Sequence, residues 1–176
     1  MPIKTLSRRN FSLNLGLGAA ALSLGACTGT VTRADDMSGK KEQAMSDNEW
    51  ANLSEADWQA RLTDMEFYVL REEGTERAGT SPLNMEKREG TYVCAGCALP
   101  LFTSEHKYDS GTGWPSFFLP IEGAVGTKTD RKLFVPRTEY HCSRCGGHQG
   151  HVFKDGPQPT GLRYCNNGVA LNFIAA

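Results

Sequence analysis

The sequence lacks the clusters of lysine and arginine with which nucleic-acid-binding proteins contact phosphates. Its 176 residues carry 19 basic and 20 acidic side chains. Three of the basic residues, Lys4, Arg8 and Arg9, fall within the first 26 residues, which contain no acidic residue. The rest of the chain is therefore net acidic, and we expect no nucleic-acid partner.

The sequence also lacks an apolar run of the roughly 20 residues that a membrane-spanning helix needs. The apolar stretch from Phe11 to Ala26 is shorter, contains Ser, Asn and Gly, and follows a basic start. Residues 1–26 are therefore predicted to be an export signal. Ser7-Arg8-Arg9-Asn10-Phe11 resembles a twin-arginine signal, and Leu24-Gly25-Ala26-Cys27 resembles a lipobox, in which Cys27 becomes lipidated. The alternative is an ordinary secretory signal with incidental arginines and a chance cysteine.

Residues 27–46 are rich in Thr, Ser, Gly, Lys and Asp, a composition that predicts a flexible tether. The folded domain is expected over residues 47–176. A lipid on Cys27 would hold this domain at the periplasmic face of a bacterial membrane, and we expect it to be a monomer there.

The domain lacks the alternation of strands and helices that is typical of a parallel sheet. Two capping patterns, Ser54-Glu55-Ala56-Asp57 and Thr63-Asp64-Met65-Glu66, predict two short consecutive helices. Short β-prone runs separated by turn residues follow, over Thr91–Cys94, Pro115–Leu119, Val125–Lys128, Lys132–Tyr140, Gly150–Phe153, Leu162–Cys165 and Val169–Ile174. They predict a mainly β fold of two antiparallel sheets behind short N-terminal helices.

Four of the six cysteines form two C-x-x-C pairs, each with a glycine inside it or directly after it. The pairs are Cys94 with Cys97 and Cys142 with Cys145. Four thiolates around Zn²⁺ make a closed tetrahedral site, so the pairs predict one structural zinc that clamps two hairpins. Two disulfides, or one redox-active pair, are the alternatives in an exported protein.

Spacing does not account for the sixth cysteine, Cys165. A lone cysteine with histidines elsewhere in the chain is a candidate nucleophile, and a buried small hydrophobe is the alternative. His148 and His151 are the candidate acid/base groups, although they are three residues apart and strand alternation would place them on opposite faces. A bend at Gly150 is therefore expected if both serve one site. Two purely structural histidines are the alternative.

The motifs occur in the order found in the methionine-R-sulfoxide reductases, the peptide-methionine (R)-S-oxide reductases. They are the first cysteine pair, the run Lys107 to Phe117 (KYDSGTGWPSF), the run Cys142 to Phe153 (CSRCGGHQGHVF) and Arg163-Tyr164-Cys165-x-Asn167. The chain resembles this family from about Asp47 to Phe173. The resemblance implies thiol-dependent reduction of oxidised protein substrates on a mainly antiparallel β fold, with a structural zinc.

The resemblance also implies roles for four polar residues. Cys165 would attack the sulfoxide sulfur and become a sulfenic acid as methionine leaves. His148 and His151 match the family's pair of imidazoles, which can stabilise and protonate the sulfoxide oxygen. Asn167 would hold the hydrogen-bond network around that oxygen.

Three further residues are implied in substrate binding. Trp114 matches the indole that packs against the substrate's S-methyl group, and Phe153 extends the same apolar wall. Core packing is the alternative for both aromatic residues. Arg163, two residues before the nucleophile, is expected to favour the thiolate, and an ordinary surface salt bridge is its alternative.

Two positions depart from the family pattern. Many members have a cysteine where Thr112 stands, and that cysteine resolves the sulfenic acid as an intramolecular disulfide. Because Thr112 has no thiol, we expect an external thiol or a thioredoxin-like partner to attack Cys165 directly. Gly168 stands where a serine is common, and the sequence does not indicate the consequence.

Two other functions fit parts of the pattern. A zinc-stabilised, non-catalytic binding module of the cell envelope would keep the metal without using Cys165. A thiol–disulfide exchanger would use one C-x-x-C pair, but that pair normally begins a helix in a βαβ unit, which the glycine-rich flanks here do not favour.

Overall fold

The computed structural model describes residues 45–132 and 135–176, and most of its regular structure is β. The predicted export signal, Cys27 and residues 27–44 of the predicted tether lie outside the described residues. Within the described part of the chain, no helix has the length and apolar character that crossing a membrane requires.

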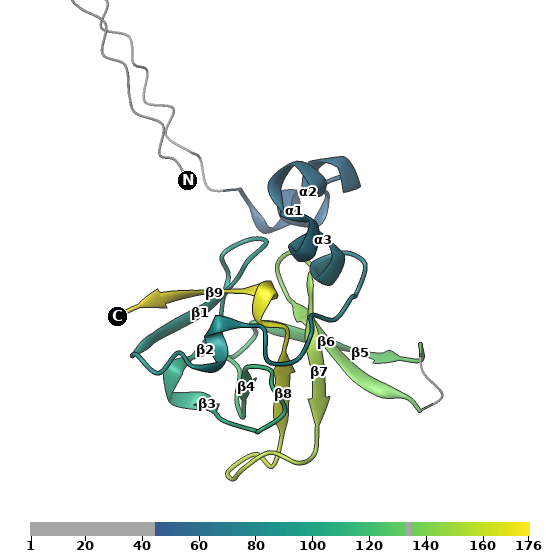
Figure 1. Ribbon diagram of the computed structural model, residues 1–176. Coiled ribbons are helices and arrows are strands. Elements are labelled where there is room, and N and C mark those ends of the chain that lie inside the picture. Colours follow the sequence, from purple (N-terminus) through teal and green to yellow (C-terminus); the bar gives the residue numbers. More distant parts are fainter. Residues whose placement is uncertain (1–44, 133–134) are drawn as a thin grey trace, which may run out of the picture. The chain divides into compact units, whose positions relative to one another are not determined.

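Three short helices precede the sheets and lie together at one end of them (Figure 1). They are α1 (Asp47–Ala51), α2 (Glu55–Arg61) and α3 (Asp64–Leu70). Ser46, Ser54 and Thr63 cap them, each with a complete capping box that stabilises the helix start by about 1 kcal/mol. The two predicted helices, α2 and α3, are confirmed, and α1 was not predicted. Helices this short are unstable alone, and burial of Trp58 on α2 and Leu70 on α3 stabilises these two.

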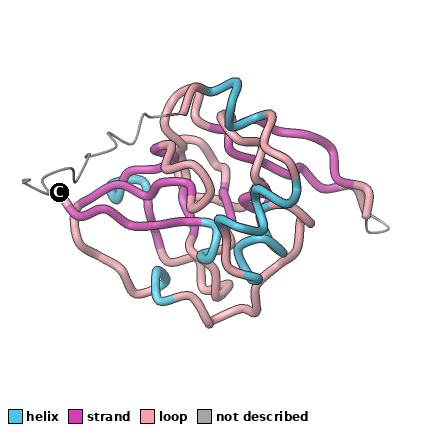
Figure 2. Tube along the Cα trace, turned by 90° about the horizontal axis from the view of Figure 1, so that it is seen from above, coloured by secondary structure: helices cyan, strands magenta, loops and turns pink. Residues whose placement is uncertain are grey.

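Within the described residues, nine strands form two antiparallel sheets, the arrangement that was predicted (Figures 1 and 2). The smaller sheet has the order β2 (Pro100–Thr103), β1 (Gly90–Cys94) and β9 (Leu171–Ala175). The larger has the order β3 (Lys107–Tyr108), β4 (Ser116–Phe117), β8 (Arg163–Asn166), β7 (His148–Phe153), β6 (Arg137–Cys142) and β5 (Val125–Asp130). Short 3₁₀ turns occupy η1 (Pro82–Asn84), η2 (Ser104–His106) and η3 (Gly168–Ala170).

The strand boundaries differ from the predicted runs at several points. Strands β2 and β3 were missed, because β2 has a proline at its first position and β3 has only two residues. Strand β6 begins at Arg137 rather than Lys132, directly after Pro136, which has no N–H for the ladder. Strand β7 begins at His148 rather than Gly150.

The two sheets share an aromatic core. Tyr92 on β1, Phe102 on β2, Phe117 on β4 and Tyr140 on β6 are all fully buried. The rings of Phe102 and Phe117 stack with centroids 4.1 Å apart, and Tyr92 meets Phe117 edge-on at 4.9 Å. These contacts join the smaller sheet to the larger one and hold β4 and its neighbour β8 in place.

Candidate active site

Cys165 lies in the middle of the larger sheet, on β8 between β4 and β7. It is opposite Ser116 on one side and His151 on the other. A Cβ atom on Gly150 would lie 1.9 Å from the carbonyl oxygen of Cys165. Only glycine therefore allows β7 to approach β8 this closely beside the sulfur.

The half-buried side chain of Cys165 lines a cavity of about 110 Å³. Of the other residues predicted for the site, four also line this cavity: Trp114, His151, Phe153 and Asn167. His148 and Arg163 do not line it, whereas Thr75 and Arg137, which were not predicted, do. The structure thus brings residues from five separate segments of the chain to one cavity.

His148 is buried behind His151, and their ring centroids are 5.4 Å apart. The expected bend is a β-bulge: His148 opposes His141 and Gly150 opposes Tyr140, so Gln149 has no partner on β6. The extra residue shifts the alternation by one and brings both imidazoles to the same region. Nδ1 of His148 contacts Glu139 Oε1 at 2.8 Å.

Glu139, the partner of His148, is itself buried. Burial raises the pKa of Glu139, but hydrogen bonds from His148 and His141 outweigh burial, so the pKa lies below its ordinary value. An ionised carboxylate accepts hydrogen bonds only, so Nδ1 of His148 carries a hydrogen. Glu139 therefore fixes the orientation of the His148 ring.

His151 is held by a second carboxylate. Its Nε2 is 2.8 Å from Asp130 Oδ2, and the same oxygen accepts a hydrogen bond from the Arg137 guanidinium at 2.7 Å. Burial lowers the pKa of His151, while Asp130 acts in the opposite direction. The pKa of Asp130 is far below its usual range, because the Lys132 backbone N–H and His151 donate to it. Asp130 is therefore ionised, and Nε2 of His151 carries a hydrogen.

Both atoms of the Asn167 amide have fixed partners. Its Oδ1 accepts from the backbone N–H of Glu76 at 3.1 Å, and its Nδ2 donates to the carbonyl of Gln149 at 3.0 Å. This pattern allows only one orientation of the amide. Since the amide nitrogen has two hydrogens, one remains for a group in the cavity.

Glu76 also fixes Trp114 and the turn after Asn167. The indole Nε1 of Trp114 donates to the Glu76 carbonyl at 3.1 Å. The buried Glu76 carboxylate accepts hydrogen bonds from the backbone N–H groups of Gly168 and Val169, the latter at 3.1 Å. Through its main chain, Glu76 therefore holds two residues that line the cavity, Trp114 and Asn167. Through its side chain it holds the start of η3.

The departure at Gly168 has a structural reason. A Cβ atom there would lie 1.9 Å from Ser81 Oγ, 2.4 Å from Ser81 Cβ and 3.1 Å from a Glu76 carboxylate oxygen. The space of a side chain at position 168 is thus already filled by Ser81. Glycine at 168 and serine at 81 are complementary in size.

The buried guanidinium of Arg163 lies in an ion pair. It makes a bidentate pair with Asp155 at 2.9 and 2.8 Å and lies over the Phe153 ring at 4.3 Å. Burial raises the pKa of the Cys165 thiol, and the charge of Arg163 opposes that rise. The ion pair is thus buried on its Arg163 side, and the predicted role of Arg163 in favouring the thiolate stays a prediction.

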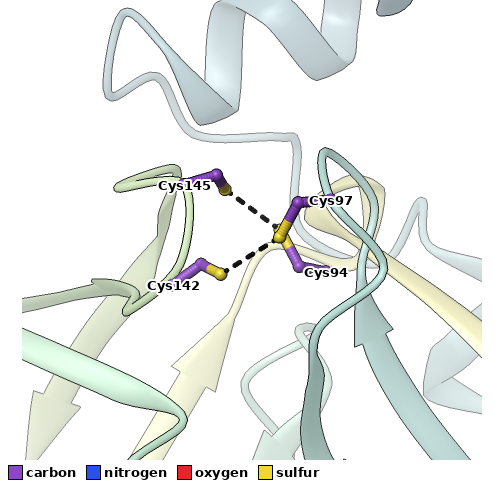
Figure 3. Close-up of side chains that lie close together, drawn as sticks. All are labelled: Cys94, Cys97, Cys142 and Cys145. Carbon is purple, nitrogen blue, oxygen red and sulfur yellow. Dashed lines mark hydrogen bonds between the residues drawn. The ribbon is translucent and has the colours of Figure 1, made fainter. Parts of the chain in front are cut away.

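The four paired cysteines form a second cluster, separate from Cys165 (Figure 3). All four are buried, and their sulfur atoms lie within 4.8 Å of one another. Cys94 and Cys145 are 3.7 Å apart at Sγ, and Cys97 and Cys142 are 3.5 Å apart. The turns that supply them are alike: Ala98 and Gly146, one residue past each pair, both have positive φ, at 58° and 69°.

The cluster fits a tetrahedral metal ion. A Zn–S distance of about 2.3 Å places tetrahedral sulfur atoms about 3.8 Å apart, close to the observed sulfur separations. No fifth His, Asp or Glu ligand joins the group among the described residues. Such a site has a structural role, because it is closed to substrate.

Gln149, the bulge residue, connects the two sites. Its buried Nε2 donates to Cys94 Sγ at 3.5 Å, and its Oε1 accepts from Asn166 at 3.3 Å. Its carbonyl accepts from Asn167. The residues directly after Cys165 are therefore hydrogen-bonded to a residue that also contacts the cysteine cluster.

Several of these residues could not be found from the sequence. Glu76 contacts the cavity residues through its backbone, and Gln149 is the unspecified residue of the His148-x-Gly150-His151 motif. Asp130 and Arg137 carry the charges that fix His151, but no short-range pattern relates them to a histidine on another strand. Only pairing of β5, β6 and β7 places them together.

Comparison with known proteins gives the same assignment as the ordered motifs. Residues 62–175 match the SelR domain. Peptide methionine sulfoxide reductase MsrB of Leptospira interrogans is 51% identical over 123 residues, which cover 69% of this chain and 94% of the relative. Peptide methionine sulfoxide reductase B1, chloroplastic, of Arabidopsis thaliana is 50% identical over 134 residues, which cover 76% of this chain and 66% of the relative. MsrB of Pseudomonas putida is 52% identical over 118 residues, or 66% and 89%. The chain therefore belongs to the SelR-domain family of methionine-R-sulfoxide reductases.

Proposed function

We propose that the protein reduces the R epimer of methionine sulfoxide in oxidised proteins to methionine, with Cys165 as the nucleophile. The observation that carries this assignment is the cavity at Cys165, which has an indole on one wall and an imidazole and an amide on the others. A sulfoxide has the complementary form, with an apolar methyl group, an electrophilic sulfur and a basic oxygen.

The reaction transfers the sulfoxide oxygen to Cys165. The thiolate attacks the sulfoxide sulfur, and the oxygen receives one proton. The hydroxyl group then moves to the Cys165 sulfur, while the transient bond between the two sulfur atoms and the sulfur–oxygen bond of the substrate break and methionine leaves. The substrate sulfur gains two electrons, and Cys165 loses two and ends as a sulfenic acid. Since burial raises the pKa of Cys165, the resting residue is mainly a thiol, and Arg163 favours its ionisation.

His151 and Asn167 are assigned to the oxygen side of the substrate. Both line the cavity, and Asn167 has one amide hydrogen free to donate to the oxygen. His151 is assigned to passing a proton to the oxygen, because it lines the cavity directly opposite Cys165 on the neighbouring strand. His148 is assigned as a second imidazole behind it, oriented by Glu139.

Trp114 and Phe153 are assigned to the methyl side. Both aromatic rings line the cavity, and the indole orientation is fixed by its hydrogen bond to Glu76. A methyl group against an aromatic face and an oxygen against polar donors define opposite sides of the sulfur. This arrangement accounts for selection of one epimer.

Regeneration is assigned to an external thiol or a thioredoxin-like reductant. The other four cysteines of the described residues are all in the buried cluster. An incoming thiol would displace water from the sulfenic acid and form a mixed disulfide with Cys165. A second thiol would then attack that disulfide, releasing Cys165 as a thiol and the reductant as its disulfide.

The cluster of Cys94, Cys97, Cys142 and Cys145 is assigned to one structural Zn²⁺. Four soft thiolates in a closed site suit zinc. Metal analysis of purified protein tests this assignment, with about one zinc per chain expected and none in a variant that lacks two of the four cysteines.

We also propose that the protein is exported by the twin-arginine route as a monomer with a lipid on Cys27. The support is the sequence of residues 1–27. Mass spectrometry of protein from the membrane fraction tests it, with a mature N-terminus at a lipidated Cys27 expected. A mature N-terminus elsewhere, or an unmodified Cys27, would contradict the proposal.

Incubation with each epimer of a peptide methionine sulfoxide and dithiothreitol tests the activity. We expect loss of the R epimer only, and no loss with Cys165→Ser. If wild-type protein reduces neither epimer, the proposed function is wrong.

A further inference from the structure

A groove of about 610 Å³ lies outside the Cys165 cavity. Its walls come from α3, from η1 and from the chain that runs from η3 into β9. Met65 on α3 and Leu83 on η1 are two of its apolar side chains. Met65 is 50% exposed, so the groove presents apolar surface to the solvent.

The groove and the Cys165 cavity share a wall. Thr75 lines the cavity, and the next residue, Glu76, lines the groove. In the same way Asn167 lines the cavity and Gly168 lines the groove. The Glu76 carboxylate accepts a hydrogen bond from the Gly168 N–H and joins the two stretches. An extended polypeptide advances about 3.3 Å per residue, so a chain with one side chain in the cavity reaches the groove within a few residues.

One side of the groove is the free edge of a sheet. β9 is the outer strand of the smaller sheet and pairs only with β1 among the described residues (Figure 1). Leu171, Asn172 and Phe173 of this strand line the groove. The strand has no charged residue, no proline and no bulge, which are the features that commonly keep an edge from pairing. Its edge is therefore open to a further strand.

Two hydrogen bonds at the ends of the β1–β9 pairing show which backbone groups face this edge. At one end Ala95 donates its N–H to the Ala170 carbonyl, and at the other Ala176 donates to the Glu89 carbonyl. Alternate residues of an antiparallel strand point their N–H and C=O groups to the same side, so the even-numbered residues of β9 face β1. Phe173 points both groups to the free edge, where neither has a partner among the described residues.

We propose that β9 and the groove bind the polypeptide next to the oxidised methionine of a protein substrate, as an added strand with apolar side chains in the groove. The occupant is the substrate because the groove shares a wall with the cavity that takes its sulfoxide. This binding mode deepens the proposed function and rests on reduction at Cys165.

The charges of the groove favour a neutral segment. Glu66 and Arg77 line it with opposite signs. The third charged residue, Glu76, is buried, and its carboxylate already accepts from two backbone N–H groups. The partner is therefore an extended, uncharged and largely apolar stretch of polypeptide.

The first test compares substrates that carry the same R sulfoxide, with dithiothreitol as the reductant. The short substrate is N-acetyl-methionine sulfoxide amide, and two long ones extend it by about six uncharged, largely apolar residues (~20 Å) on the N-terminal or the C-terminal side. We expect kcat/KM of at least one long substrate to exceed that of the short one by about tenfold. The gain should fall on KM, because strand pairing holds the ground state and the transition state alike. Equal kcat/KM for all three substrates would overturn the assignment.

The second test places single N-methyl groups along the extension that shows the gain. Only every second amide of a strand faces its neighbour. Methylation should therefore remove most of the gain at alternate positions and leave it intact at the positions between them. A loss that is the same at every position, or no loss at any, would show that no strand is added to β9.

The third test is a matched pair, Met65→Glu and Met85→Glu. Both methionines are exposed, at 50% and 77%, but only Met65 lines the groove. Met65→Glu should lower the ratio of kcat/KM for the long substrate to that for the short one by about threefold, and Met85→Glu should leave it unchanged. The ratio is the readout because partial unfolding lowers both rates equally. An unchanged ratio in Met65→Glu, or the same fall in both variants, contradicts the assignment.

Reduction of the short substrate separates the two proposals. If wild-type protein reduces its R epimer but extension brings no gain, only the groove assignment fails; this outcome is expected if a second copy or the chain's own residues 27–44 cover β9. A protein reductant in the groove cannot produce the gain, because dithiothreitol supplies the electrons. If wild-type protein reduces neither epimer, the proposed function itself fails.

Discussion

The cysteine cluster and Cys165 differ in the surroundings of the same type of side chain. The clustered cysteines are buried, come from two similar turns and have one another's sulfur atoms as neighbours at 3.5–3.7 Å. Cys165 is half-buried in a strand, and its neighbours are a hydroxyl, a guanidinium and an imidazole. Convergent thiols make a metal site and contribute stability, whereas a single thiol among donors is reactive. Substitution of a clustered cysteine should therefore lower stability, whereas substitution of Cys165 should lower activity.

The largest expected effect is on turnover, from Cys165→Ser. Loss of a nucleophile lowers the rate of such enzymes by about 10⁴-fold or more, while the free energy of unfolding should change by no more than about 1 kcal/mol. Activity on the R epimer and chemical denaturation are measured on the same preparation. An active serine variant would contradict the distinction between the two kinds of cysteine.

Substitution of a cysteine in the cluster should mainly lower stability and metal content. Cys142→Ser removes one of four ligands, and the free energy of metal binding is part of the free energy of folding. We expect the free energy of unfolding to fall by roughly 5 kcal/mol, with metal content well below one per chain. Metal analysis and denaturation measure both quantities. A variant that keeps wild-type stability without metal would show that the cluster is not a structural site.

A smaller effect is expected at the turn after Asn167. Gly168→Ser places a side chain where Ser81 lies, at 1.9 Å from its hydroxyl, and overpacking of this kind costs about 1–3 kcal/mol. The double variant Ser81→Gly with Gly168→Ser should regain most of that stability. Denaturation of the two single variants and the double variant forms a thermodynamic cycle. Additive losses would contradict the size complementarity.

The smallest effects are in pH dependence, and they should have opposite signs at the two sites. The pKa of Cys165 is raised in the folded protein. Its contribution to stability is therefore present below the pKa of an unfolded thiol and is lost as pH rises through the folded-state pKa. Its alkylation should accelerate over the same range. The cluster should instead release metal as pH falls, because protons compete for its thiolates.

Both responses are measurable in one titration. A chromogenic chelator reports released metal, and alkylation of the Cys165 peptide reports thiolate. If alkylation of Cys165 does not change with pH, its pKa is not raised.

Sequence patterns predicted those features that depend on short spacing. The two C-x-x-C pairs, the capping boxes of α2 and α3 and the ordered motifs around Trp114, His151 and Cys165 all lie within a few residues. The fold class followed from the same local signals. The metal-sized grouping of four sulfur atoms is confirmed.

Features that depend on distant pairing could not be predicted. The bulge at Gln149 is defined only against β6, and it decides that His148 lies behind His151. Ser81 and Gly168 are complementary in size, but 86 residues lie between them in the sequence.

Glu76 has a consequence for the choice of substrates. Its N–H is bonded to Asn167 and its carbonyl to Trp114, so a single residue ties together the polar and the apolar wall of the cavity. The relative position of the two walls, and with it the space that a substrate side chain would enter, is therefore set by the main chain of one residue.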